Sequence, residues 1–202
     1  MTDIHSTWTE NRATWTKSAH LVGEAIKDIE EALPFPITDY SADNGNEVLN
    51  EKIFDYFQNR PAGKKVNVTR GRPYQKNDQA YVEQKNNSHV RGIFGYERIE
   101  DRGLIQRMNE IYEIWNTLQN FFIPTMKCIE KKRDGAKVKK KYDKPKTPYQ
   151  RILESADVGE EAKQKLRATY EKLNPFELSN KLGKQQQAFF GILKRAKQPI
   201  VA

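Results

Sequence analysis

Two acidic residues that stand 40 positions apart, Asp43 and Glu83, have the setting of a metal-binding pair. Asp43 follows a run that favours a β-strand, residues 36–40, and Asn44 and Gly45 come soon after that run. Asn and Gly accept left-handed backbone conformations at little cost, so we expect a turn there. Asp43 would then lie at the carboxyl end of a strand, which is where ligands of open α/β sheets bind.

Glu83 lies in a polar segment that we expect to be helical. Asn86 and Asn87 follow it by three and four positions, which would place them on the same helix face. Carboxylates brought together from a strand end and a helix face suit Mg²⁺ or Mn²⁺. The alternative is that Asp43 serves only as a turn residue and Glu83 only as part of a solvated helix face.

Cations and an aromatic ring fill the stretch that precedes Glu83. Such a group suits contact with phosphates and stacking on an unpaired base, although it also fits an ordinary polar loop. The residues of this stretch are Arg70, Arg72, Tyr74 and Lys76. Lys85 and Arg91 would reach the same ligand, although solvent-facing cations are common on helices. We interpret His89 as a solvent-facing or hydrogen-bonding residue and not as a metal ligand.

Positive charge is concentrated in residues 126–151. This segment holds eleven Lys or Arg residues against three acidic ones, so it accounts for the whole net charge of +8. A concentrated patch attracts a phosphate backbone more strongly than the same charge spread evenly. A solvated, flexible linker is the alternative. Pro145, Pro148 and the density of lysines favour an extended strap without regular structure.

Alternating strand and helix patterns elsewhere indicate an α/β protein. Apolar residues recur at helical spacing over residues 21–33, 48–57 and 104–122, and residues 66–69 read as a strand. Two short β-like pieces precede residue 16, and Thr16 or Ser18 would cap the first helix. Beyond the strap, we expect a helix near residues 162–173 and another that starts at Pro175. This tail would pack on the core or pair with another subunit.

Composition limits the class of protein. The single cysteine, Cys128, excludes a disulfide framework and a four-cysteine zinc site, and we expect it to be buried or half-buried. Charged residues make up 31% of the chain and the mean hydropathy is −0.89. No stretch has the length of a transmembrane helix, and the start of the chain lacks an apolar signal segment. We therefore expect a soluble cytoplasmic protein that does not bind membranes.

Several motifs occur together in a fixed order. They are Asp-Asn-Gly at 43–45, Arg-Pro-Tyr at 72–74 and Val-Glu-Gln-Lys-Asn at 82–86. Trp-Thr-Glu at 8–10 precedes them, and Thr-Pro-Tyr-Gln-Arg at 147–151 follows. This combination resembles the integrase catalytic core of DDE-type bacterial insertion-sequence transposases, relatives of retroviral integrases in the ribonuclease H-like superfamily. The resemblance covers about the first three quarters of the chain.

The resemblance implies a mixed sheet flanked by helices and two-metal phosphoryl transfer on DNA. Asp43 and Glu83 would be catalytic and would hold Mg²⁺ or Mn²⁺, supported by Asn44, Gly45, Asn86 and Asn87. The expected partners are DNA and further copies of the chain in a transposition complex, with the protein associated with the nucleoid when it is bound to DNA. The residues expected to contact DNA are Arg70, Arg72, Tyr74, Lys76, Lys85, Lys137, Lys139, Lys140 and Lys141.

The same family uses a third carboxylate on an opening strand, which would precede residues 2–8; Asp3 matches a second-strand position that binds no metal. We therefore expect a core that lacks its first strand and is inactive as this chain alone. The alternative is a non-catalytic DNA-binding or regulatory remnant of a transposase. The expected divisions are a partial catalytic core at 1–125, the basic strap at 126–151 and the helical tail at 152–202.

Overall fold

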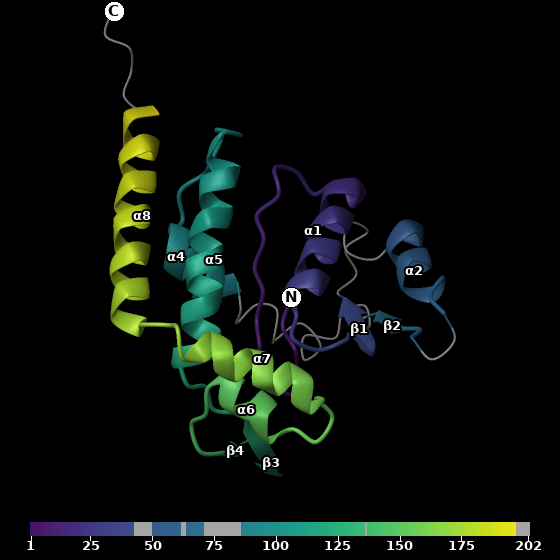
Figure 1. Ribbon diagram of the computed structural model, residues 1–202. Coiled ribbons are helices and arrows are strands. Elements are labelled where there is room, and N and C mark those ends of the chain that lie inside the picture. Colours follow the sequence, from purple (N-terminus) through teal and green to yellow (C-terminus); the bar gives the residue numbers. More distant parts are fainter. Residues whose placement is uncertain (43–49, 62–63, 71–85, 136, 197–202) are drawn as a thin grey trace, which may run out of the picture. The chain divides into compact units, whose positions relative to one another are not determined.

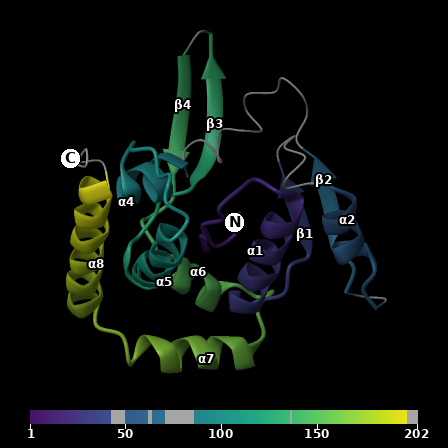
Figure 2. The ribbon, with the colours of Figure 1, turned by 90° about the horizontal axis from the view of Figure 1, so that it is seen from above.

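The computed structural model describes residues 1–42, 50–61, 64–70, 86–135 and 137–196 (Figures 1 and 2). The chain is an α/β protein in which helices accompany two small sheets of two strands each within these residues. It divides into two compact units. One unit combines Met1–Glu10 with Glu113–Leu182, and the other combines Asn11–Tyr112 with Gly183–Ala202.

A parallel strand–helix–strand unit lies in the second of these units. β1 (Asp39–Ala42) pairs in parallel with β2 (Asn67–Arg70), and α2 (Glu51–Gln58) lies between them in the sequence. Parallel neighbours require a crossover connection, and here the amphipathic α2 belongs to that connection. The fully buried ring of Phe57 in α2 lies 4.8 Å from the ring of Tyr40 in β1. The expected alternation of strand, helix and strand is confirmed, although the first strand begins at residue 39 and not at 36.

The helix α1 (Ala19–Ala32) forms where its apolar periodicity predicts it. Ser18 is its N-cap, and the Ser18 hydroxyl accepts a hydrogen bond from the backbone N–H of Leu21 at 3.3 Å. Ile26 and Ile29 are the buried residues of the helix and lie on one face.

A half-buried ion pair connects α1 with the end of α2. The Arg60 guanidinium donates two hydrogen bonds to the Glu30 carboxylate, at 2.8 and 2.6 Å, and the Tyr56 hydroxyl donates a third at 2.6 Å. Burial alone would raise the pKa of Glu30, but the hydrogen bonds from Arg60 and Tyr56 outweigh it and lower that pKa. Burial and the bond to Glu30 raise the pKa of Tyr56 to about 12.

The long helix α5 (Leu104–Phe122) also forms as predicted, and its residues are divided between the two units. In the second unit, Phe94 lies against Tyr112 of α5 and Phe189, with ring centroids 5.1 and 5.2 Å apart. Phe94 belongs to α4 (Gly92–Phe94), which follows a π-helical segment, η1 (Asn86–Arg91). Among the described helices, none carries an apolar stretch long enough to cross a membrane.

The helices after residue 147 complete the first unit. They are α6 (Pro148–Glu154), α7 (Glu160–Tyr170) and α8 (Pro175–Ala196), the last of which also extends into the second unit. The rings of Tyr149 and Tyr170 stack at 4.7 Å, and Phe121 of α5 lies 5.3 Å from Tyr149. The two predicted tail helices are confirmed, whereas α6 was not predicted.

Neither of the two β-like pieces expected before residue 16 forms a strand. Thr2 and Thr9 make an isolated bridge, and the residues between them turn back on themselves. The Asp3 carboxylate accepts hydrogen bonds from the backbone N–H and the hydroxyl of Ser6, at 2.6 and 2.5 Å. Thr7 has a positive φ of 65°. The short polar side chain of Asp3 therefore favours a local turn over an extended strand.

The ion pair between α1 and α2 allows a stability test. We expect Arg60→Ala to lower the free energy of unfolding by about 1–3 kcal/mol, because it leaves the half-buried Glu30 carboxylate without its two-pronged partner. Urea unfolding followed by circular dichroism measures the change. Arg98→Ala is the matched control, because Arg98 pairs with Glu100 on the surface and such a pair contributes less than about 1 kcal/mol. Equal effects of the two variants would contradict this account.

Candidate functional site

Most of the residues expected to perform chemistry fall outside the part of the chain that the structure describes. They are Asp43, Asn44, Gly45, Arg72, Tyr74, Lys76, Glu83 and Lys85. The metal site and the loop cations that precede Glu83 therefore stay predictions. Among the described residues, no three His, Cys, Asp or Glu side chains come together as a metal-binding group.

The structure describes several residues that lie close to Asp43 and Glu83 in the sequence. β1 ends at Ala42, directly before Asp43 in the sequence, and Ala42 pairs with Arg70 at the end of β2. Because the strands are parallel, their carboxyl ends lie at the same edge of the small sheet. Arg70 is exposed there. Asn87 lies in η1 and is also exposed.

His89 is buried, with 3% of its surface exposed, so its interpretation as a solvent-facing residue is wrong. The Asn11 side-chain nitrogen lies 3.5 Å from Nδ1 of His89, which supports the hydrogen-bonding interpretation. His89 belongs to η1, and it faces inward while its two sequence neighbours are exposed.

The basic segment forms a hairpin. β3 (Cys128–Asp134) and β4 (Lys137–Tyr142) pair antiparallel, and every described residue of both strands is exposed. Figure 2 shows the two strands side by side. The expectation of a strap without regular structure is therefore wrong. Gly135, with φ of 59°, supplies the turn conformation that other residues rarely adopt, and Pro145 follows only after the second strand has ended.

Cys128 opens the hairpin and is exposed, which contradicts the buried or half-buried position that we expected. Its thiol donates to the backbone oxygen of Glu130 at 3.3 Å. The reason is the local architecture: a strand that faces solvent on both sides gives no residue a buried position, whatever its side chain prefers.

The hairpin has two chemically different faces. Strand alternation and register place Glu130, Lys132, Asp134, Lys137, Lys139 and Lys141 on one face, which we call the paired face. There, the Nζ of Lys132 lies 2.7 Å from Oε1 of Glu130, and the Nζ of Lys139 lies 3.4 Å from Oδ2 of Asp134. The other face, which we call the acid-free face, holds Cys128, Lys131, Arg133, Val138, Lys140 and Tyr142.

Like charges oppose each other across the two strands. Lys131 lies directly opposite Lys140 on the acid-free face, and Lys132 lies opposite Lys139 on the paired face. Directly opposed like charges destabilise an antiparallel pair. On the paired face, carboxylates offset this repulsion. The acid-free face offers its opposed lysines no carboxylate among the described residues of the two strands.

An ion pair holds the base of the hairpin. The Arg151 guanidinium of α6 donates to the Asp143 carboxylate at 2.6 Å and to the backbone oxygen of Thr125 at 2.8 Å. The other Asp143 oxygen accepts from the backbone N–H of Lys127 at 2.6 Å. The hydrogen bond from Arg151, followed by the one from Lys127, lowers the pKa of Asp143. The start and the end of the hairpin are thus joined to one buried arginine, which is 9% exposed.

Sequence reasoning missed this anchor, although a signal for it exists. Thr147 and Gln150 form a capping box at the start of α6, with Pro148 in the first turn. Thr-x-x-Gln with Pro at the second position is a recognisable helix start. It would have predicted α6 and would have placed Arg151 on a helix in place of an irregular strap.

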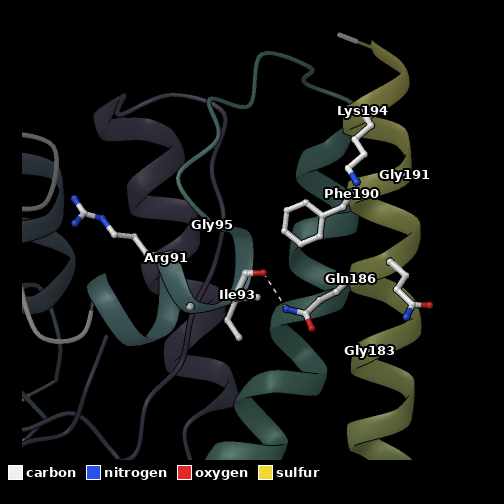
Figure 3. A pocket seen from close by; sticks show the side chains of 10 residues that line it. Arg91, Ile93, Gly95, Gly183, Gln186, Phe190, Gly191 and Lys194 are labelled. Carbon is white, nitrogen blue, oxygen red and sulfur yellow. Dashed lines mark hydrogen bonds between the residues drawn. The ribbon is translucent and has the colours of Figure 1, made fainter. Parts of the chain in front are cut away.

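A groove in the second unit lies between the η1–α4 region and α8 (Figure 3). Arg91, Phe190 and Lys194 are among its lining residues, and the Gln186 side chain donates to the backbone oxygen of Ile93 at 2.9 Å. The lining side chains include no acid, histidine, cysteine or hydroxyl.

Comparison with known proteins finds a relative without an established function. An uncharacterized protein of Sinorhizobium fredii, y4rM, is 35% identical to this chain over 151 residues. The match covers 75% of this chain and 42% of that protein, so the chain spans less than half of the relative's length. No protein-family model matches the chain, and no solved structure matches it.

The anchor at the base of the hairpin should contribute strongly to stability. We expect Asp143→Asn to lower the free energy of unfolding by about 1–3 kcal/mol, because it leaves the buried Arg151 without a charged partner. Thermal or urea unfolding measures the loss. Asp157→Asn on the exposed surface is the matched control and should change it by less than about 0.5 kcal/mol. A loss no larger than that of the control would show that the anchor is dispensable.

The same anchor predicts a dependence on pH. Because the pKa of Asp143 in the folded protein lies below its ordinary value of 3.8, the folded state favours the charged carboxylate. Its contribution is fully present above about pH 4 and is lost as the pH falls through the lower, folded-state pKa. The stability difference between wild type and Asp143→Asn should therefore shrink in acid. A difference that stays constant from pH 6 to about pH 2 would contradict the assignment.

Proposed function

We propose that this chain is part of a DDE-type transposase catalytic core with a ribonuclease H-like fold, which acts on DNA by metal-dependent phosphoryl transfer, and that this chain alone is inactive. The observation that carries the proposal is the parallel β1–α2–β2 unit, whose first strand ends directly before Asp43. That arrangement is what the resemblance requires around its second carboxylate. The order of the motifs along the chain supports the same reading.

In this proposal, Asp43 and Glu83 hold Mg²⁺ or Mn²⁺. Carboxylate oxygens are the ligands that these ions prefer, so the donor set fits. A bound ion would stabilise negative charge on the attacking and departing oxygens of a phosphodiester. Asn44 and Gly45 would shape the turn after the strand, and Asn86 and Asn87 would support the Glu83 side.

DNA is the proposed partner, and the basic hairpin supports this choice. The hairpin and its flanks concentrate the net charge of +8, and the cations lie on two exposed strands. Arg70 is exposed at the end of β2, where it pairs with Ala42, the residue that precedes Asp43 in the sequence. We propose that Arg70, Arg72, Tyr74, Lys76 and Lys85 contact DNA near the reacting phosphodiester, and that self-association assembles the complex.

A second candidate is a metal-independent DNA-binding or regulatory protein derived from a transposase. The hairpin favours this second candidate, because its exposed positive charge does not depend on Asp43, on Glu83 or on a metal ion. The two candidates differ in their metal requirement. DNA binding that depends steeply on salt but not on Mg²⁺ or Mn²⁺, with no metal bound at Asp43 and Glu83, would favour the second. Because the relative extends well beyond the matched region, we propose either activity for a longer protein of which this region is a part.

Iron-directed backbone cleavage tests whether the two acids share one ion. Fe²⁺ replaces Mg²⁺ in oxygen-ligand sites and, with ascorbate and peroxide, cuts the chain beside its ligands. We expect fragments that end near residue 43 and near residue 83, and both sets should disappear in Asp43→Asn and in Glu83→Gln. Excess Mg²⁺ should suppress both cuts by competition.

The control for this experiment is Asp157→Asn, which removes an exposed acid far away in the sequence and should leave the fragments unchanged. Cleavage near only one of the two acids, or cleavage that survives Asp43→Asn, would show that Asp43 and Glu83 do not form one site. The metal-dependent proposal would then fail.

A further inference from the structure

We propose that the acid-free face of the β3–β4 hairpin is the surface that binds the phosphate backbone of duplex DNA, through Lys131, Arg133 and Lys140. This inference rests on the proposed function only in taking DNA as the partner. It specifies the face, and it assigns Lys137, Lys139 and Lys141, on the opposite face, a smaller part in binding than the sequence suggested.

The first argument is the placement of charge. The acid-free face carries three cations and no acid, whereas the paired face carries four cations and two acids. On the paired face, Lys132 and Lys139 are each within 4 Å of a carboxylate that competes with any phosphate. Lys131, Arg133 and Lys140 form no ion pair within the described part of the chain. They are therefore more available to an external anion than Lys132 and Lys139.

The second argument is the repulsion between Lys131 and Lys140. These residues are direct cross-strand partners, so their side chains leave the ribbon side by side. Neighbouring ammonium groups repel each other in the free protein. A phosphate oxygen between them would add two attractive interactions that outweigh this repulsion, because charge-assisted hydrogen bonds to phosphate are among the stronger ones. The two opposed lysines therefore destabilise the free hairpin, and a bound polyanion would stabilise it.

The third argument is the chemistry around these cations. The Nε of Arg133 donates to the backbone oxygen of Gly135 at 3.3 Å, which fixes the guanidinium near the turn. Val138 and Tyr142 on the same face are 44% and 48% exposed. A tyrosine hydroxyl binds phosphate oxygens, and an aliphatic surface packs on deoxyribose. Cations, a hydroxyl and a small apolar area thus lie on one strip of surface.

The shape of the ribbon favours duplex DNA over duplex RNA. A two-stranded antiparallel ribbon fits the major groove of B-form DNA, which is about 12 Å wide. The major groove of A-form RNA is too narrow and deep for side chains to enter. The anchor formed by Asp143 and Arg151 holds the base of the ribbon before any ligand arrives, which lowers the entropy lost on binding.

Two triple variants of the full chain test the inference. Lys131→Gln/Arg133→Gln/Lys140→Gln removes the cations of the acid-free face, and Lys137→Gln/Lys139→Gln/Lys141→Gln removes three from the paired face. Both lower the net charge by the same amount, from +8 to +5. Fluorescence anisotropy gives the affinity for a duplex of about 25 base pairs over a series of salt concentrations.

We expect the acid-free-face variant to reduce the salt slope of log K by about 3 and the affinity at 0.1 M salt by about 100-fold. The paired-face variant should change the slope by less than about 1. Circular dichroism should show both variants folded, since each removes one lysine or both lysines of a directly opposed pair and leaves the anchor at Asp143 and Arg151 in place. Should the triple variant unfold, Lys140→Glu against Lys139→Glu makes the same comparison with single changes.

The other possible results test the choice of face and the choice of DNA separately. Equal losses in both triple variants would show that the total charge and not the face determines binding, and the inference would fail while DNA stays the partner. Tighter binding to duplex RNA, or to phosphatidylcholine vesicles that contain phosphatidylserine, would identify a different polyanion and overturn the choice of DNA. Wild-type protein that binds no DNA would remove the partner from both proposals. Failure of the iron-cleavage test alone would leave this inference standing.

Discussion

Repulsion between opposed lysines is a constraint on the β3–β4 hairpin of the first unit. Lys131 and Lys140 stand opposite each other on a ribbon that is exposed on both sides. An isolated two-stranded hairpin is at best marginally stable in water, and like charges across the strands weaken it further. The ribbon gains no burial of its own that would offset this repulsion. Its stability must therefore come from its base, where Asp143 and Arg151 connect both ends of the hairpin to α6.

Several local interactions form the base of the hairpin. Thr147, Pro148 and Gln150 start α6, so that Arg151 emerges from a fixed helix and reaches Asp143 and the backbone of Thr125. The stacked rings of Tyr149 and Tyr170 pack α6 on α7, and Phe121 joins them from α5. An apolar cluster thus positions a buried guanidinium, and the guanidinium positions an exposed cationic ribbon. The chemistry offered to a partner is polar, but its support is a packed aromatic core.

Sequence patterns predicted the elements in which several apolar residues recur at helical spacing, and they missed the exposed hairpin and the short helix α6. The helices α1 and α5 and the two long tail helices follow from apolar residues at helical spacing. The hairpin was missed because lysines occupy both of its faces, so no alternation of apolar and polar residues marks it. α6 is short, and its capping box was overlooked, while Asp3 formed a local turn where a strand was expected. Within the candidate site, the sequence predicted a strand over residues 36–40 shortly before Asp43, and β1 ends at Ala42. The Asp143–Arg151 ion pair, in contrast, depends on tertiary contacts that no spacing rule encodes.

Hydrogen exchange of the backbone amides in β3 and β4, with and without duplex DNA, tests the central claim most directly. If phosphates neutralise the repulsion between the opposed lysines, amides across Cys128–Asp134 and Lys137–Tyr142 should exchange at least about tenfold more slowly in the complex, because opening of the ribbon becomes less favourable. Amides of α7, away from the ribbon in the sequence, should exchange at unchanged rates. Unchanged exchange in the ribbon while DNA is bound would contradict the account.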